Sequence, residues 1–203
     1  MGDSTDIGTA SSLPVHVEIP GYRLRYASDT DAIGIWFSAE QEKLGRKVTL
    51  KVLNPKYESH PQARREFLAE MDRMAPLDHP NLPHVLDMVR EGTLVLVVER
   101  IGSMALNRHL AQEKKPMPEA RALGVALGVA KGLAYLWGKG LAHKNVCPRT
   151  VVLRDDAECR LVPFRNLITT EELKALKGKL AQDPQYAAPE QLAGPDPVGP
   201  TTP

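Results

Sequence analysis

The sequence predicts an α+β protein with a strand-rich first half and a helix-rich second half. Short apolar runs separated by turn residues fill residues 22–99, and one segment among them has helical spacing. Further along, thirteen of the eighteen residues in 120–137 are apolar. We therefore expect a five-stranded antiparallel sheet with one helix, followed by a mainly helical part.

Five short runs have the composition and alternation of strands. In the first, Tyr22, Leu24 and Tyr26 alternate with polar residues, as a half-buried strand requires. Short turns at 40–46 and 91–93 connect neighbouring runs, which favours hairpins and an antiparallel sheet. The expected strands are 22–26, 33–39, 47–53, 85–90 and 94–99.

A helix is expected between the third and fourth strands. Residues 59–62, Ser-His-Pro-Gln, resemble a capping box with proline in the first turn. Phe67, Met71 and Met74 then recur at i, i+4 and i+7, which forms one apolar stripe. We expect the helix to end at residues 79–81, His-Pro-Asn.

The second half predicts a short helix at about 103–112 and a longer one at about 118–138. Because the longer helix is apolar nearly all round, we expect it to be buried on several sides. It contains three internal glycines, each of which costs about 1 kcal/mol relative to alanine. Their presence suggests close packing against neighbouring segments.

Composition divides the chain into four parts. Residues 1–18 are small and polar and are expected to be a disordered lead. Residues 19–101 form the strand-rich part and residues 102–192 the helical part. Residues 193–203 are proline-rich and are expected to be a flexible tail.

The charge balance and the cysteine count exclude several classes of protein. With 26 basic and 25 acidic residues, the chain has no electrostatic case for binding nucleic acid or a membrane surface. The two cysteines fit a reducing compartment, and they show no zinc-like spacing with the histidines. No signal-peptide core or long apolar run is present, so we expect a cytoplasmic protein.

Six motifs in order resemble those of a protein kinase. Residues 143–153, which begin His143-Lys144-Asn145, resemble the catalytic loop H-R-D-L-x-x-x-N. The others are Lys51 in a strand, Glu70 in the following helix, the hinge-like 98–101, Pro163-Phe164-Arg165 in the place of D-F-G, and Ala188-Pro189-Glu190 matching A-P-E. From residue 19 to residue 192 the chain thus resembles a protein kinase, with its two-lobed fold. Residues 19–22, Ile-Pro-Gly-Tyr, and 44–47, Leu-Gly-Arg-Lys, further resemble bacterial eukaryotic-like Ser/Thr protein kinases.

The resemblance implies roles for four residues if a nucleotide is bound. Lys51 would pair with the nucleotide phosphates, and Glu70 would be its partner on the helix. Glu99 and Ile101 would present backbone groups to the adenine. A plain ion pair that holds the helix to the sheet is the competing explanation for Lys51 and Glu70, and it is the one we favour.

Three departures from the kinase pattern bear on catalysis. Asn145 stands where the resemblance places the catalytic Asp, and an amide cannot accept a proton near neutral pH. Thr150 and Pro163 stand where the two magnesium ligands belong. These positions predict a chain that is not an enzyme, has no catalytic residues and binds no metal.

The glycine-rich loop also departs from the pattern. Asp29 and Asp31 replace two of its glycines, and their carboxylates are expected to repel phosphates. Trp36 replaces the valine that covers the adenine, and its indole has the size to fill that space. We therefore expect no nucleotide cofactor.

The chain stops soon after residues 188–190, whereas a full kinase continues with helices that cover the 118–138 helix. This predicts a truncated, catalytically inactive pseudokinase that acts as a protein-binding scaffold or regulatory subunit. Its partner would be another protein subunit, or a second copy, bound through 118–138.

Two alternatives remain open. One is a metal-independent nucleotide-sensing pseudokinase that uses Lys51, Glu70 and 98–101 to switch a partner protein. The other is an enzyme for a different group transfer, which would need a carboxylate near Lys51; Asp155 and Asp156 follow the loop but have the character of a turn.

Overall fold

The computed structural model describes residues 17–31, 33–102, 104–113, 115–154, 158–163, 167–175 and 184–187. The chain forms two compact units. The first holds Met1–Met71 and Leu86–Arg100, and the second holds Asp72–Val85 and Ile101–Pro203. Residues 72–85, which the sequence assigned to the first part, thus group with the second. Residues 1–16 of the predicted lead and all of the predicted tail lie outside the described residues.

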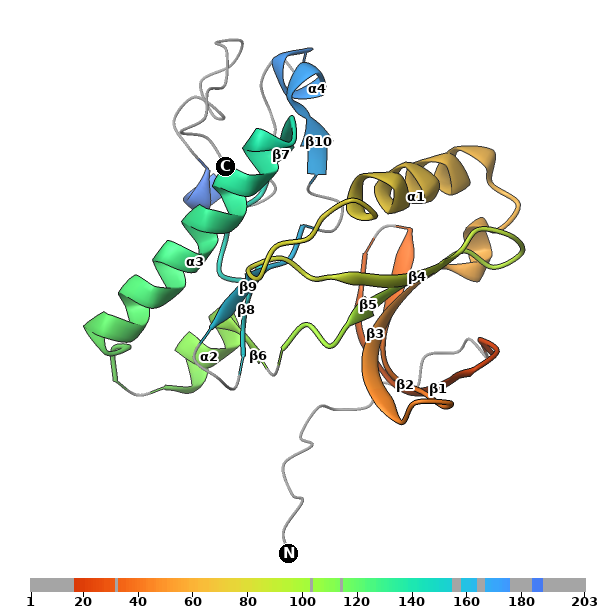
Figure 1. Ribbon diagram of the computed structural model, residues 1–203, viewed down its shortest axis with the longest axis horizontal. Helices are drawn as coiled ribbons and strands as arrows, with labels where there is room; N and C mark the ends of the chain where they lie inside the picture. Colours follow the sequence, from red (N-terminus) through yellow and green to blue (C-terminus); the bar gives the residue numbers. More distant parts are fainter. Residues whose placement is uncertain are drawn as a thin grey trace, which may run out of the picture. The chain divides into compact units, whose positions relative to one another are not determined.

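The first unit is built on a five-stranded sheet with the order β1-β2-β3-β5-β4 (Figure 1). The β1–β2, β2–β3 and β3–β5 pairs are antiparallel. The α+β, kinase-like fold class that the sequence predicts is therefore confirmed. The strands are β1 (Tyr22–Thr30), β2 (Gly34–Gln41), β3 (Arg46–Leu53), β4 (Val85–Val89) and β5 (Val95–Glu99), and a 3-10 turn, η1 (Pro55–Tyr57), follows β3.

The register of β2 and β3 separates the two faces of this sheet. Ile35 pairs with Val52 and Phe37 with Leu50, so these apolar side chains share one face and form a buried cluster. Between them, Trp36 pairs with Lys51 on the opposite face. The alternation of the strands thus places a lysine and an indole side by side, away from the main apolar cluster of the sheet.

The helix α1 (Pro61–Met74) follows η1. The predicted capping box does not form as expected, because the N–H of Ala63 donates to the ring nitrogen Nδ1 of His60 at 3.3 Å. The helix also ends at Met74, before the predicted stop at 79–81. Within the first unit, α1 contributes the buried side chains of Phe67 and Glu70.

In its described residues, the second unit contains α2 (Leu106–Gln112), α3 (Glu119–Gly138) and α4 (Thr170–Ala175) together with five very short strands. The helix predicted from about residue 103 begins at Leu106, because Met104 and Ala105 pair instead with Leu153 and Val152. The short strands are β6 (Met104–Ala105), β8 (Val151–Leu153) and β9 (Cys159–Leu161) in one sheet, and β7 (Leu141–His143) and β10 (Leu167–Thr169) in another.

One face of α3 packs against β7 and β9 (Figure 1). Only four of its residues are buried, namely Val125, Gly128, Gly132 and Leu136, so the expectation of burial on several sides is wrong. Leu123 and Leu127 are 62% and 56% exposed. Within the described part of the chain, no helix has both the length and the apolar character needed to cross a membrane.

Candidate functional site

Lys51 lies in the first unit with its side chain fully buried. Its Nζ is 2.7 Å from each carboxylate oxygen of Glu70, so the expected ion pair with the helix is present. A second carboxylate also reaches it, because Nζ is 2.9 Å from Oδ2 of Asp31. A charge removed from water needs such partners, since an unpaired buried charge is strongly destabilising.

Aromatic rings and one glycine complete the surroundings of Lys51. Its Nζ lies 5.2 Å from the ring centroid of Trp36 and 5.4 Å from that of Phe67, within the range of cation–π attraction. A Cβ at Gly34 would lie 2.6 Å from Cε of Lys51. Glycine at position 34 therefore leaves the space that the lysine stem occupies.

Asp31 sits in the loop between β1 and β2 and accepts hydrogen bonds from several donors. Its Oδ1 accepts from the N–H groups of Ile33 and Gly34 at 3.0 and 2.8 Å, and its Oδ2 from the indole Nε1 of Trp36 at 3.3 Å. Burial by itself raises the pKa of Asp31. The charge of Lys51, the hydrogen bond from Lys51 and those from the N–H groups of Ile33 and Gly34 outweigh burial and hold the pKa of Asp31 below its usual range, so the carboxylate stays ionised.

The sequence alone does not reveal this role of Asp31, since both Asp29 and Asp31 are expected from it to repel phosphates. Asp29 instead accepts the N–H of Thr30 at 2.8 Å in an exposed position, whereas Asp31 pairs with Lys51. The available signal was an acid three residues before the loop glycine Gly34, close enough for a turn in which the carboxylate accepts backbone N–H groups.

The remaining nucleotide-site residues of the prediction do not gather in one unit. Glu99 lies at the end of β5 opposite Val48, in the first unit, and Ile101 belongs to the second. Their predicted backbone contacts with an adenine stay predictions.

The loop after β7 in the second unit is organised around His143. The imidazole is buried; its Nδ1 accepts the N–H of Asn145 at 3.3 Å, and its Nε2 lies 3.1 Å from the carbonyl oxygen of Val162. One accepting and one donating nitrogen match a neutral imidazole. Burial lowers the pKa of His143 to about 4, which keeps the ring neutral near pH 7.

Thr150 holds the same loop together from the inside. Its hydroxyl lies 3.1 Å from the carbonyl oxygen of Asn145 and 2.9 Å from that of Cys147, and it accepts the N–H of Cys147 at 3.1 Å. The N–H of Thr150 donates to the same Cys147 carbonyl at 2.9 Å. The side chain therefore serves as a local cap of the turn.

These residues do not fit magnesium. Mg²⁺ prefers carboxylate oxygens in octahedral geometry, whereas the two ligand positions hold the engaged hydroxyl of Thr150 and the oxygen-free side chain of Pro163. Among the described residues, no cluster of three or more His, Cys, Asp or Glu side chains is suited to a metal ion. Residues 164–166, 188–190 and the pair Asp155 and Asp156 lie outside the described residues.

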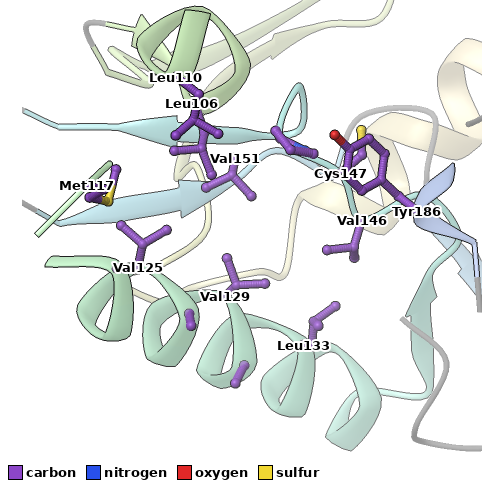
Figure 2. Close-up of a pocket in the computed structure, with 14 residues that line it drawn as sticks. Leu106, Leu110, Met117, Val125, Val129, Leu133, Val146, Cys147, Val151 and Tyr186 are labelled. Carbon is purple, nitrogen blue, oxygen red and sulfur yellow. The ribbon is translucent and has the colours of Figure 1, made fainter. Parts of the chain in front are cut away.

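The second unit also carries an apolar groove of about 550 Å³ along α3. Figure 2 shows Val125, Val129 and Leu133 pointing from α3 into this groove, with Val151 and Cys147 among the residues facing them. Leu106 and Leu110 of α2 and Tyr186 also line it. All of these residues belong to the second unit. We call this feature the α3 groove.

Helical spacing explains the apolar character of the α3 groove. Its α3 lining residues recur every three or four positions and so form one stripe along the helix. Leu123 and Leu127 each follow a lining residue and continue the apolar surface around the helix. Between residues 122 and 137 the sequence has a single charge, Lys131. The α3 lining residues are Ala122, Val125, Ala126, Val129, Ala130 and Leu133.

Comparison with known proteins agrees with this fold. The profile of the family described as protein tyrosine and serine/threonine kinase matches residues 32–195. The chain is 29% identical over 183 residues to the serine/threonine-protein kinase pkn2 of Myxococcus xanthus, covering 85% of the chain and 22% of that protein. It is also 29% identical over 182 residues to PknA of Mycobacterium tuberculosis, covering 86% of the chain and 42% of that protein.

A third relative is the DNA damage-responsive serine/threonine-protein kinase RqkA of Deinococcus radiodurans, which is 29% identical over 163 residues, or 78% of the chain and 24% of that protein. The chain thus spans less than half of the length of each of these relatives.

The expectation that the chain is not an enzyme is wrong. The family that matches is one of kinases, and the relatives are named serine/threonine-protein kinases, which points to an enzyme. The resemblance to bacterial Ser/Thr kinases that the motifs suggested is confirmed. The chain belongs to the protein tyrosine and serine/threonine kinase family.

Proposed function

We propose that this kinase-family chain acts mainly by binding another protein through the α3 groove, as a scaffold or regulatory subunit, and that its phosphoryl transfer is slow. The observation that carries the proposal is the α3 groove itself, an open apolar groove with a volume of about 550 Å³. A volume of this size lies within the range of established binding sites, about 300–1,000 Å³.

The catalytic loop supports slow phosphoryl transfer. Phosphoryl transfer depends on positioning and on charge neutralisation by metal ions, and Thr150 and Pro163 offer no carboxylate to hold them. A positioned general base typically contributes about 10²–10⁴-fold to a rate. Asn145 cannot supply that factor, since an amide does not take up a proton near neutral pH.

The shape of the α3 groove favours an amphipathic helix as its occupant. The lining stripe runs from Ala122 to Leu133, which at about 1.5 Å per residue is a length of about three helical turns. A partner helix presents apolar anchors at i, i+3 or i+4, and i+7, which span about two turns and so fit within the length of this stripe. Apolar patches that extend over exposed leucines such as Leu123 and Leu127 mark interaction sites more often than free surface.

The geometry gives less support to the alternative of a nucleotide-sensing protein that uses Lys51, Glu70, Glu99 and Ile101. The charge of Lys51 is already matched by Glu70 and Asp31.

We also propose a cytoplasmic location. Both cysteines of the chain are unpaired and buried, as is typical of proteins in a reducing compartment.

A matched pair of substitutions tests the α3 groove. Ala126 lies in the lining stripe and is exposed, so Ala126→Glu places a charge in the groove without disturbing the core. Ala120 is exposed on the same helix and does not line the groove, so Ala120→Glu is the control. We expect proteins captured from the source cell by the wild type to include one that Ala126→Glu loses and Ala120→Glu retains.

The captured protein is then purified and its affinity for all three chains is measured. The proposal requires at least about a tenfold weaker affinity for Ala126→Glu, because a buried unpaired charge costs several kcal/mol. Equal affinity for the two variants would refute docking in the groove. If light scattering instead shows that the wild type dimerises and Ala126→Glu does not, the occupant is a second copy and the separate partner is refuted.

A further inference from the structure

The loop between β1 and β2 holds a carboxylate in a setting suited to a phosphate group. From this geometry we infer that Asp31 acts as an internal substitute for phosphate, closing an anion-binding site at Lys51 that would otherwise take a phosphate or pyrophosphate group. This inference rests on the first unit alone and is independent of the α3 groove.

Four N–H donors converge on the Asp31 carboxylate. They are the backbone N–H groups of Ile33 and Gly34 at 3.0 and 2.8 Å, the indole N–H of Trp36 at 3.3 Å and the Nζ of Lys51 at 2.9 Å. Backbone N–H groups of neighbouring residues that point to one spot, together with a lysine, are a common way to bind phosphate oxygens. Asp31 satisfies all four donors with its own two oxygens.

The charges around Lys51 oppose any further anion while Asp31 is in place. One lysine cation faces two carboxylates, those of Asp31 and Glu70, within hydrogen-bond distance. The Nζ is fully buried, so water screens these charges poorly. A phosphate brought to the same donors would meet a net negative charge, and like charges at an interface strongly disfavour binding.

Asp31 is the carboxylate that can be removed with the least damage. Its side chain is 19% exposed in a loop, whereas that of Glu70 is 9% exposed on α1. Without Asp31, Lys51 keeps its two contacts with Glu70, and the donors of Ile33, Gly34 and Trp36 lose the carboxylate they share. The substitution Asp31→Ala should therefore open an anion site without leaving a buried lysine unpaired.

Calorimetric titration with pyrophosphate in metal-free buffer tests the inference. Asp29→Ala is the matched control, because Asp29 lies two residues before Asp31 at the end of β1, carries the same charge and contacts only the N–H of Thr30 in the described hydrogen bonds. We expect Asp31→Ala to bind pyrophosphate at least about tenfold more tightly than the wild type, while Asp29→Ala behaves as the wild type.

The two tryptophans locate the binding. In NMR spectra the indole N–H resonance of Trp36 should shift when Asp31→Ala is titrated, and that of Trp137 should not, because Trp137 lies in the second unit. Asp31→Asn, which removes the charge and retains an oxygen, is the second variant and should also bind more tightly than the wild type. The inference is overturned if the wild type binds as tightly as these variants, if both variants fold yet bind no more tightly, or if Asp29→Ala gains the same affinity.

Discussion

At the scale of single residues, the buried ion group around Lys51 shows most directly how local geometry affects the stability of the fold. Its position on β3 opposite Trp36 fixes which face of the sheet it reaches, and Glu70 on α1 meets it there. Asp31 then reaches the same Nζ from the loop before β2. A buried ion group of this kind need not add net stability, but the loss of its single cation leaves two carboxylates facing each other.

We therefore predict that Lys51→Met lowers the free energy of unfolding by roughly 3–5 kcal/mol, the cost of leaving buried charge uncompensated. Lys47→Met is the control, because it makes the same change of residue type at an exposed position on the same strand. Its effect should stay within about 0.5 kcal/mol. Urea denaturation of both variants measures the difference, and similar losses would contradict the paired arrangement.

The buried imidazole of His143 predicts a loss of stability in acid. Burial is the main reason that its folded pKa is about 4, against about 6.5 in an unfolded chain. The unfolded chain thus binds a proton first as the pH falls. The contribution is fully present above about pH 6.5 and is lost by about pH 4, with a size of roughly 3 kcal/mol.

NMR titration of the His143 ring checks this prediction directly, alongside urea midpoints at neutral and acidic pH. The ring should remain neutral throughout the range from about pH 7 to pH 5. If the ring takes up its proton near pH 6.5 in the folded protein, His143 is not buried in the way described.

The two sides of α3 differ sharply at the scale of elements. Its buried face lies close to residues 81–82 and 159, where Gly128 and Gly132 allow near contact. The neighbouring face, which shares Val125 with the buried one, lines the α3 groove, and the exposed leucines Leu123 and Leu127 lie beyond it. The apolar residues of α3 thus serve two purposes, packing in the core and lining the groove. The position of each residue around the helix decides which of the two it does.

Glycine-to-alanine substitutions at Gly124 and Gly128 should have opposite effects. A Cβ at Gly128 would lie 2.7 Å from Sγ of Cys159 and 2.8 Å from Nδ2 of Asn81, so overpacking should destabilise by about 1–3 kcal/mol. A Cβ at Gly124 meets nothing within 4 Å, and the better helix former should stabilise by up to about 1 kcal/mol. Thermal or urea unfolding measures both, and the same sign for the two variants would contradict this packing.

The longer helices and strands were predictable because each spans enough residues to show a pattern of apolar side chains in the sequence. Alternation indicated β1, short apolar runs bounded by turns indicated β2 to β5, and helical spacing gave α1 and α3 to within a few residues at their starts. The strands β6 to β10 have only two or three residues each, too few to show a period. They form because distant segments pair, as Met104 does with Leu153.

The candidate site was predictable to a similar degree. The pair of Lys51 and Glu70 followed from motifs, since each residue lies in a regular element whose position the pattern fixes. The contact of Asp31 did not, because the path of a loop is set by hydrogen bonds such as those from Ile33 and Gly34. Likewise, the sequence does not show which side of α3 is exposed, because apolar residues occur on nearly every face of this helix.

At the scale of the whole molecule, the family and the proposed function rest on different features. The order of motifs and the five-stranded sheet place the chain among the kinases. The α3 groove and the residues at positions 145, 150 and 163 carry the proposal that protein binding dominates over phosphoryl transfer. The groove is therefore the feature on which the account depends most.

Fluorescence of an apolar dye with the isolated chain tests that central claim without knowledge of any partner. We expect the wild type and Ala120→Glu to bind the dye equally, and Ala126→Glu to bind it several-fold more weakly, because the charge lies in the α3 groove. A wild-type chain that binds no dye, or an Ala126→Glu variant that binds as well as the wild type, would contradict it.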